Sequence, residues 1–318
     1  MSFAAVSPSP ACTVCKIKSA DVVQDLDVSP EELEALLELT QELKTNPIKF
    51  TQALANKYIV LLFEKPSLRT RLTFELAIKQ LGGDCVVQTG MIGDREPLKD
   101  VARNLDRWAQ AVVARTFSQQ TVEELARWSS VPVVNALSDA WHPCQALADV
   151  FTMRERWGSL RGRKVAFIGD GNNVAKSLMV TALRLGAHFA LACPPGYEPQ
   201  PAVLDVARQL AQASRCELLI TNVPALALTN ADAVCTDVWA SMGHEAERQK
   251  RLSDFEAYRV NGEAMAQAKR DALFLHCLPA HRGEEVTDEV IESPQSAVFD
   301  EAENRLHTQK ALLLMLLS

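Results

Sequence analysis

Short apolar runs alternate with segments of helical period along most of the chain. The first run, Tyr58 to Phe63, has strand length, and apolar residues then recur at helical spacing from Phe74 to Leu81. The same alternation continues through the second half of the chain. Strands that alternate with helices form parallel sheets, and 318 residues suit two domains of ordinary size. The sequence therefore predicts an α/β protein with two doubly wound parallel-sheet domains, in which the C-terminal helix packs back on the first domain.

The stretch after the first strand has the composition of an anion-binding site. Pro66 favours extended backbone at the preceding residue, so strand gives way to helix near Ser67. Hydroxyl and guanidinium groups then fill the first helical turn, where the helix dipole would favour acidic side chains. These groups belong to Ser67, Arg69, Thr70 and Arg71. A helix N-terminus with forked arginine donors suits a phosphate; the alternative is an ordinary N-cap with exposed arginines.

Two further polar residues follow strand-like runs in the first half. Arg115 ends an apolar run, where a buried charge is unfavourable unless a partner neutralises it. His142 opens a helix that follows the run at 131–134. Ligands of a parallel sheet collect beyond the carboxyl ends of its strands. We therefore expect Ser67, Arg115 and His142 to converge on one anion.

The turn at 169–173 in the second half contains Gly-x-Gly and invites a dinucleotide-binding interpretation. The third glycine of that pattern is absent, because Val174 occupies its place. Cys193 and Pro194, rather than an acidic residue, close the next strand. A dinucleotide-binding oxidoreductase domain is therefore the weaker alternative for this half.

Two later strand ends carry reactive side chains. The segment from Asp237 to Gly243 combines a carboxylate, a hydroxyl and a flexible glycine, and a charged, helix-prone stretch follows. This pattern suggests that residues 239–255 close over a ligand. The last apolar strand ends at His276 and Cys277. A small buried core residue is the alternative interpretation of this cysteine.

Composition restricts the class of protein. A net charge of −7, from 33 basic and 40 acidic residues, argues against a general nucleic-acid binder. The apolar run at 311–317 is too short to span a membrane. Eight cysteines in a chain of this size indicate reduced thiols and a cytoplasmic location. Residues 1–21 are expected to form a disordered extension.

Five motifs resemble those of the aspartate/ornithine carbamoyltransferase family, and within it the ornithine-specific members. They stand in order over residues 22–318, and five collinear motifs make chance implausible. The motifs are Ser67-Leu68-Arg69-Thr70-Arg71, His142-Pro143-Cys144-Gln145, Asp237 to Gly243, His276-Cys277-Leu278-Pro279 and Glu301-Ala302-Glu303-Asn304-Arg305. Leu68 stands where many members have threonine, and its backbone N–H can still serve there.

The resemblance implies a role for each matching residue. The residues implied to bind carbamoyl phosphate are Ser67, Leu68, Arg69, Thr70, Arg115, His142, Gln145, Cys277, Leu278 and Arg305. The residues implied to bind the amino-acid end of ornithine are Asn173, Asp237, Ser241 and Met242. Catalysis would involve Asp237, Cys277, Arg115 and His142.

The resemblance also implies the reaction. Members transfer the carbamoyl group of carbamoyl phosphate to the δ-amine of L-ornithine, giving L-citrulline and phosphate without a cofactor or metal. Residues 22–148 with the helix 304–318 would bind carbamoyl phosphate, and residues 149–303 would bind ornithine. The expected assembly is a homotrimer or a multiple of trimers that acts in arginine biosynthesis, with neither nucleic acid nor membrane as partner. An acylated ornithine, putrescine or aspartate as acceptor, and a non-catalytic relative, are the alternatives.

Overall fold

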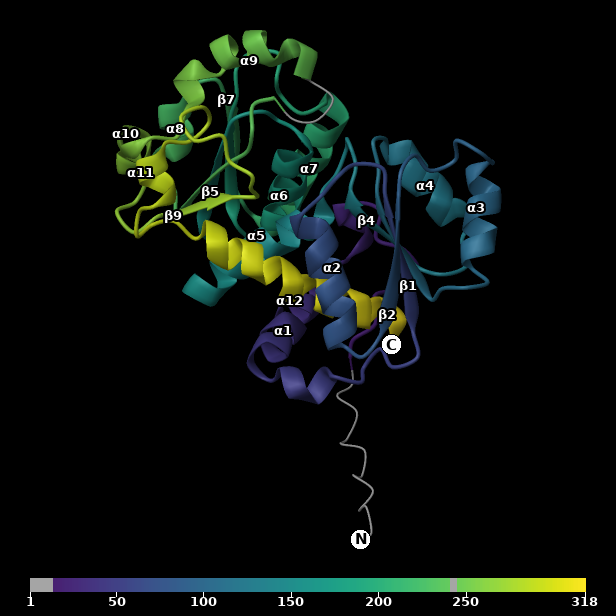
Figure 1. Ribbon diagram of the computed structural model, residues 1–318. Helices are drawn as coiled ribbons and strands as arrows, with labels where there is room; N and C mark the ends of the chain where they lie inside the picture. Colours follow the sequence, from purple (N-terminus) through teal and green to yellow (C-terminus); the bar gives the residue numbers. More distant parts are fainter. Residues whose placement is uncertain (1–13, 241–244) are drawn as a thin grey trace.

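The computed structural model describes residues 14–240 and 245–318, which form two parallel sheets with helices on their faces (Figure 1). In the first sheet the strand order is β2-β1-β3-β4. Its strands are β1 (Tyr58–Phe63), β2 (Asp84–Thr89), β3 (Ala111–Arg115) and β4 (Val133–Leu137). Its helices are α1 (Pro30–Thr45), α2 (Arg69–Gln80), α3 (Leu98–Leu105) and α4 (Gln119–Trp128). The strand order reverses between β1 and β3, and this is where ligands of doubly wound sheets bind.

The second sheet has the order β7-β6-β5-β8-β9 and is also parallel throughout. Its strands are β5 (Lys164–Ile168), β6 (His188–Ala192), β7 (Leu218–Thr221), β8 (Ala233–Thr236) and β9 (Leu273–His276). Its helices are α6 (Asn173–Arg184), α7 (Pro201–Ser214), α8 (Pro224–Leu228), α9 (Arg248–Asp254), α10 (Gly262–Gln267) and α11 (Asp288–Ile291). The order reverses between β5 and β8, so this domain has its own switch point.

Burial on both faces explains why the strands are continuous apolar runs. Every residue of β3 is buried. Val113 packs into the core that α1 and α12 share, whereas Val112 and Ala114 face the other core, which α3 and α4 cover. Period-two alternation of polarity is absent because neither face of this strand meets water. The predicted fold class is confirmed.

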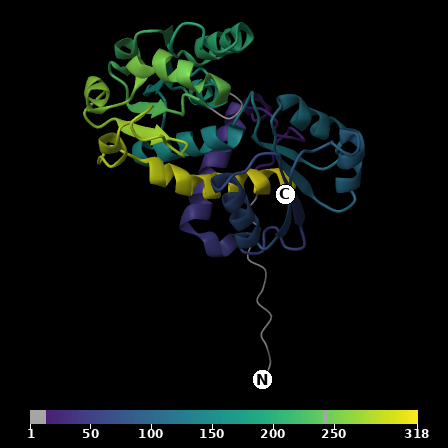
Figure 2. The ribbon, with the colours of Figure 1, turned by 45° about the horizontal axis from the view of Figure 1, so that its top comes forward.

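Two helices connect the domains, namely α5 (Pro143–Trp157) and α12 (Val298–Leu317). α12 crosses beneath both sheets and packs against α1, α2 and α5 (Figure 2). It begins six residues earlier than the predicted start at Asn304. The early turns are hard to recognise in the sequence because polar residues, including Glu301 and Arg305, are buried there. None of the described helices is both long and apolar enough to cross a membrane.

The expected disordered extension over residues 1–21 needs correction for the part that the structure describes. Ile17 is buried, and its N–H donates to the carbonyl oxygen of Met315 in α12 at 3.1 Å. The N–H of Lys18 donates to the Glu32 carboxylate at 2.7 Å. Contact with α12 and α1 therefore orders the chain from Ile17. Residues 1–13 lie outside the described residues.

Candidate active site

The guanidinium groups of two arginines meet at one threonine hydroxyl. Thr70 lies in the first turn of α2, Arg115 ends β3, and Arg305 lies in α12. Nη1 of Arg115 lies 3.4 Å from Thr70 Oγ1, and Nη2 of Arg305 donates to the same oxygen. All three side chains are buried. Segments far apart in the sequence thus place two positive charges beside the N-terminus of a helix.

Burial makes this pair of cations unfavourable by itself. Burial, and after it the charge of Arg305, lowers the pKa of Arg115 to about 10, and burial lowers the pKa of Arg305. The Nε atom of each has no hydrogen-bond partner among the described residues. Neither guanidinium has a carboxylate of the described chain within ion-pair distance, 4.0 Å. Two buried cations that no carboxylate of the described residues pairs with directly favour the binding of an anion.

His142 and Gln145 lie at the start of α5, close to these arginines. Burial lowers the pKa of His142 well below its usual value, and Arg305 and Arg115 lower it further, so the imidazole is neutral. Its Nδ1 has no partner within residues 14–240 and 245–318. Oε1 of the buried Gln145 likewise has none there. The site therefore offers a neutral imidazole and an amide oxygen acceptor beside two cations.

A pair of buried carboxyl groups holds Gln145. Its Nε2 donates to Asp149 Oδ1 at 2.7 Å and to Glu301 Oε1 at 2.6 Å. Burial raises the pKa of Asp149 to about 7, and it raises the pKa of Glu301 well above the usual value, as does the charge of Asp149. Two adjacent buried carboxyl groups cannot both ionise readily, so the pair keeps one proton. These two hydrogen bonds hold the amide nitrogen of Gln145 against the carboxyl pair, so its Oε1 atom remains available as an acceptor.

A thiol and a carboxylate meet at the ends of β8 and β9. Cys277 Sγ donates to Asp237 Oδ1 at 3.1 Å. Burial raises the pKa of Cys277 well above its usual value, and the charge of Asp237 raises it further, so the thiol stays protonated. Asp237 Oδ2 accepts a hydrogen bond from Asn172 Nδ2 at 2.8 Å. The carboxylate is therefore oriented from both sides.

His276 holds the backbone that follows it. Its Nδ1 accepts the N–H of Leu278 at 2.9 Å, so the ring hydrogen is on Nε2 and is donated to Glu285 at 3.1 Å. Leu278 has a φ of 55°, a left-handed conformation that is unfavourable for leucine. The imidazole thus stabilises a strained backbone beside Cys277. Asp237, His276 and Cys277 place ligand atoms within 4.8 Å of one another, but hydrogen bonds already use those atoms.

The structure places the other predicted residues as follows. Ser67 and Arg69 are half-buried at the start of α2, and Leu68 has an exposed side chain. Arg71 forms an ion pair with Glu75 at 2.7 Å. Ser67 follows β1, Arg115 ends β3 and His142 follows β4, which are the strands expected to bring these residues together.

The remaining predicted residues belong to the second domain. Asn173 donates from Nδ2 to the carbonyl oxygen of Ser138 at 2.6 Å, which ties the second domain to the loop before α5. Ser241 and Met242 lie outside the described residues.

Sequence reasoning missed Asn172, which caps α6 and also binds Asp237. Its place directly before a helix is the signal that could have identified it.

Part of the expected closing segment 239–255 is firmly anchored. The buried Arg251 in α9 forms an ion pair with Asp170 at 2.6 Å and donates to the carbonyl oxygen of Trp239 at 2.9 Å. Phe255 is fully buried and stacks on Trp239. The described end of the segment, from Arg251 to Phe255, is therefore packed into the second domain.

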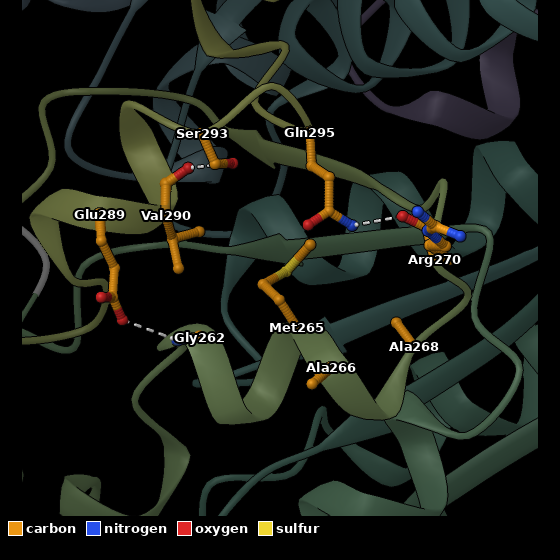
Figure 3. A pocket seen from close by; sticks show the side chains of 9 residues that line it. All are labelled: Gly262, Met265, Ala266, Ala268, Arg270, Glu289, Val290, Ser293 and Gln295. Atoms are coloured by element: carbon orange, nitrogen blue, oxygen red, sulfur yellow. Dashed lines mark hydrogen bonds between the residues drawn. The ribbon is translucent and has the colours of Figure 1, made fainter.

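Another hollow lies on the surface between α10 and α11, with a volume of about 400 Å³ (Figure 3). Glu289 contributes to its wall and accepts the N–H of Gly262 at 3.0 Å, while Met265 projects toward Gln295. None of the candidate site residues lines this hollow. It is therefore separate from the cluster around Thr70 and Asp237.

Family models match both halves of the chain. The model for the carbamoyl-P binding domain of aspartate/ornithine carbamoyltransferase matches residues 20–155, and the model for the Asp/Orn binding domain matches residues 161–316. The chain belongs to the aspartate/ornithine carbamoyltransferase family.

Individual members of this family are similar over nearly the whole chain. An ornithine carbamoyltransferase of Thermus thermophilus is 50% identical over 301 residues, covering 93% of this chain and 96% of the relative. An ornithine carbamoyltransferase of Anoxybacillus flavithermus is 48% identical over 308 residues, covering 95% of this chain and 98% of the relative. The solved ornithine carbamoyltransferase of Pyrococcus furiosus superposes with a TM-score of 0.91 at 44% identity, covering 94% of this chain and 97% of that chain. The chain is therefore a carbamoyltransferase, and the similarity supports ornithine as acceptor.

The carboxyl pair makes a prediction about stability. Because the pKa of Asp149 is raised, the folded protein binds more protons than the unfolded chain between about pH 4 and pH 7. The contribution of Asp149 to the free energy of unfolding should therefore fall as pH rises through this window, by up to about 1.4 kcal/mol per pH unit for one carboxyl group. Urea unfolding at pH 5 and pH 8 should show the parent losing stability relative to Asp149→Asn.

The matched control is Asp205→Asn, since Asp205 is exposed on α7. The difference in the free energy of unfolding between this variant and the parent should stay constant with pH. A constant difference for Asp149→Asn as well would contradict the raised pKa.

Proposed function

We propose that the protein transfers the carbamoyl group of carbamoyl phosphate to the δ-amine of L-ornithine, giving L-citrulline and phosphate. The observation that carries this proposal is the contact of two buried guanidiniums with Thr70 at the N-terminus of α2. A small acyl donor with a phosphate dianion supplies the negative charge that this arrangement lacks. The match to the carbamoyl-P binding domain supports this donor, and the similarity to relatives named ornithine carbamoyltransferase supports this acceptor.

The phosphate would bind at the first turn of α2. Its backbone N–H groups have no partners within the helix, and the dipole is positive there. We assign the phosphate contacts to Ser67, the backbone at Leu68, Arg69, Thr70 and Arg115. As the bond to phosphate breaks, these groups stabilise the leaving dianion.

The carbamoyl group would lie between α5 and β9. Its oxygen would accept hydrogen bonds from Arg115 and from the neutral His142. Its NH₂ group needs acceptors, which Gln145 Oε1 and the carbonyl groups at Cys277 and Leu278 would provide. Arg305 holds Thr70 from the other side. Charge that develops on the carbonyl oxygen during attack is thereby stabilised without a metal.

Ornithine would bind on the second domain, through Asn173, Asp237, Ser241 and Met242. In the reaction the δ-amine attacks the carbonyl carbon, the carbon–oxygen bond to phosphate breaks, and the amine loses one proton. Asp237 is the acceptor that we assign to this proton. The protonated thiol of Cys277 acts by orienting Asp237, because its raised pKa keeps it from serving as the base.

Other acceptors remain as experimental alternatives. Putrescine lacks the α-carboxylate, an acylated ornithine lacks the free α-amine, and aspartate has no terminal side-chain amine. Product formation measured with each acceptor separates them, and ornithine should give the highest kcat/KM. A faster reaction with any of the other three would contradict the proposed substrate.

We propose a homotrimer, or a multiple of trimers, as the resemblance to the family implies, and an exposed apolar stripe on the first domain supports association between copies. Leu68, Leu72 and Leu76 are 69%, 47% and 46% exposed on one face of α2, and Val86 of the neighbouring edge strand is 62% exposed. A second copy would bury this surface and bring its 89–97 loop to the phosphate. Light scattering should give a multiple of three 35.0 kDa chains; one or two chains would contradict the trimer.

We also propose that the enzyme acts in the cytoplasm in arginine biosynthesis. Residues 22–148 with helix 304–318 would form its carbamoyl phosphate domain, and residues 149–303 its ornithine domain. Restoration of growth without arginine in a strain that lacks citrulline synthesis tests the biosynthetic role. Failure to restore growth, despite activity in the extract, would contradict it.

The phosphate contact can be tested with two arginines of the same helix. Arg69→Ala removes a guanidinium from the proposed phosphate site and should lower kcat/KM for carbamoyl phosphate about 100-fold or more in a colorimetric citrulline assay. Arg71→Ala is the matched control, because this guanidinium pairs with Glu75 at the surface. It should stay within about threefold of the parent. Equal losses in the two variants would contradict the assignment.

The reaction should become faster as pH rises. A free δ-amine resembles lysine, with a pKa of about 10.4, so only about one molecule in a thousand is nucleophilic near neutrality. Below that pKa, kcat/KM for ornithine should rise about tenfold per pH unit between about pH 6 and 9. Neither His142 nor Cys277 should interrupt this rise, because their pKa values lie well below and well above the usual ones. A flat profile would contradict a free amine as the nucleophile.

A further inference from the structure

A chain of hydrogen bonds runs from the N-terminal segment to the backbone of His142. Asp25 lies in the 3-10 helix Asp25–Asp27, and Ser177 lies in α6. Ser177 Oγ donates to Asp25 Oδ2 at 2.5 Å, and the backbone N–H of His142 donates to Ser177 Oγ at 2.8 Å. All three residues are buried. This series of hydrogen bonds joins three segments that are separate in the sequence.

The polarity of these hydrogen bonds is fixed. A backbone N–H can only donate, so the Ser177 oxygen must accept from His142. The hydroxyl has a single hydrogen, and an ionised Asp25 carboxylate can only accept it. Burial raises the pKa of Asp25 to about 6, which leaves the carboxylate mostly ionised at pH 7.5. Asp25 thus directs the Ser177 hydrogen away from His142 and turns its oxygen toward the His142 N–H.

Further contacts fix Asp25 to one face of α6. Thr181 Oγ1 donates to Asp25 Oδ1 at 3.1 Å, and Arg184 Nη1 donates to the Asp25 carbonyl oxygen at 2.7 Å. Ser177, Thr181 and Arg184 follow the four- and three-residue spacing that places side chains on one side of a helix. The carboxylate therefore has a defined position relative to Ser177.

Apart from Ser177, His142 is held by its backbone carbonyl oxygen, which accepts from the N–H groups of Gln145 at 3.0 Å and Ala146 at 3.3 Å within α5, whereas its side chain has few means of being held in place. It is the N-cap residue of α5, but its side chain makes no capping hydrogen bond. Its Nδ1 has no partner among the described residues. Arg115 and Arg305, which lie near the ring, are both cations and offer no acceptor. The hydrogen bond to Ser177 is therefore a direct polar anchor of the residue whose ring faces the proposed carbamoyl oxygen.

We propose that Ser177, oriented by Asp25, is a positioning residue that sets the place of His142 for carbamoyl transfer. This inference rests on the proposed function, in which His142 donates to the carbamoyl oxygen. Neither Asp25 nor Ser177 touches a substrate in this account. Both act only through the position of the His142 backbone, so their loss should affect the reaction rather than the binding of ornithine.

Two buried hydroxyls of α6 provide a matched comparison. Ser177 and Thr181 both donate to Asp25, but only Ser177 contacts His142. Ser177→Ala should lower kcat/KM for carbamoyl phosphate about tenfold or more, because small misplacements of a catalytic group are costly. Thr181→Val should stay within about twofold, and both variants should leave KM for ornithine unchanged. Thermal unfolding of both variants measures the loss of stability that they share.

The outcomes separate the two proposals. If the parent forms no citrulline, the proposed function fails. If the parent is active and the two variants lose equal activity, the positioning role is overturned and the hydroxyls are only structural. If Ser177→Ala does not fold, Asp25→Asn takes its place, since a neutral amide is a weaker acceptor for Ser177. It should lose more activity than Thr181→Val, and an activity equal to the parent would overturn the role of Asp25.

Discussion

The contact of Arg115 and Arg305 with a single threonine hydroxyl is the interaction on which the rest of the site depends. Two like charges held in a buried place repel each other and lose hydration. The fold nevertheless brings them there, because β3 ends at Arg115 and α12 passes behind α2. An anion in contact offsets this repulsion, so binding energy and fold stability are linked at this point.

The neighbouring groups add only one negative charge, which the Asp149–Glu301 pair carries. His142 is an uncharged imidazole, the Asp149–Glu301 pair retains a proton, and Cys277 remains a thiol. Burial is the leading cause of each shift. A dianion therefore meets two cations whose charge the Asp149–Glu301 pair offsets only in part, while Asp237 lies on the ornithine side. This separation suits a reaction in which phosphate leaves on one side and an amine loses a proton on the other.

Local patterns in the sequence predicted the parallel sheets and the place of Ser67, Arg115 and His142 at strand ends. This worked because strand length, helix period and strand-end position are properties of short segments. The start of α12 was predicted six residues too late, because buried polar side chains such as Glu301 hide its apolar period. The order at Ile17 depends on a contact with Met315 near the other end of the chain. Asn172, Asp25 and Ser177 act through hydrogen bonds between distant segments, which no local pattern records.

The central claim is that the two buried guanidiniums create the affinity for a phosphate dianion. Calorimetric titration with a carbamoyl phosphate analogue, in which a methylene group replaces the bridging oxygen, tests it most directly. Arg115→Met keeps the bulk of the side chain and removes its charge, so the variant should bind the analogue at least about 100-fold more weakly than the parent. Equal affinity in the parent and the folded variant would contradict the account.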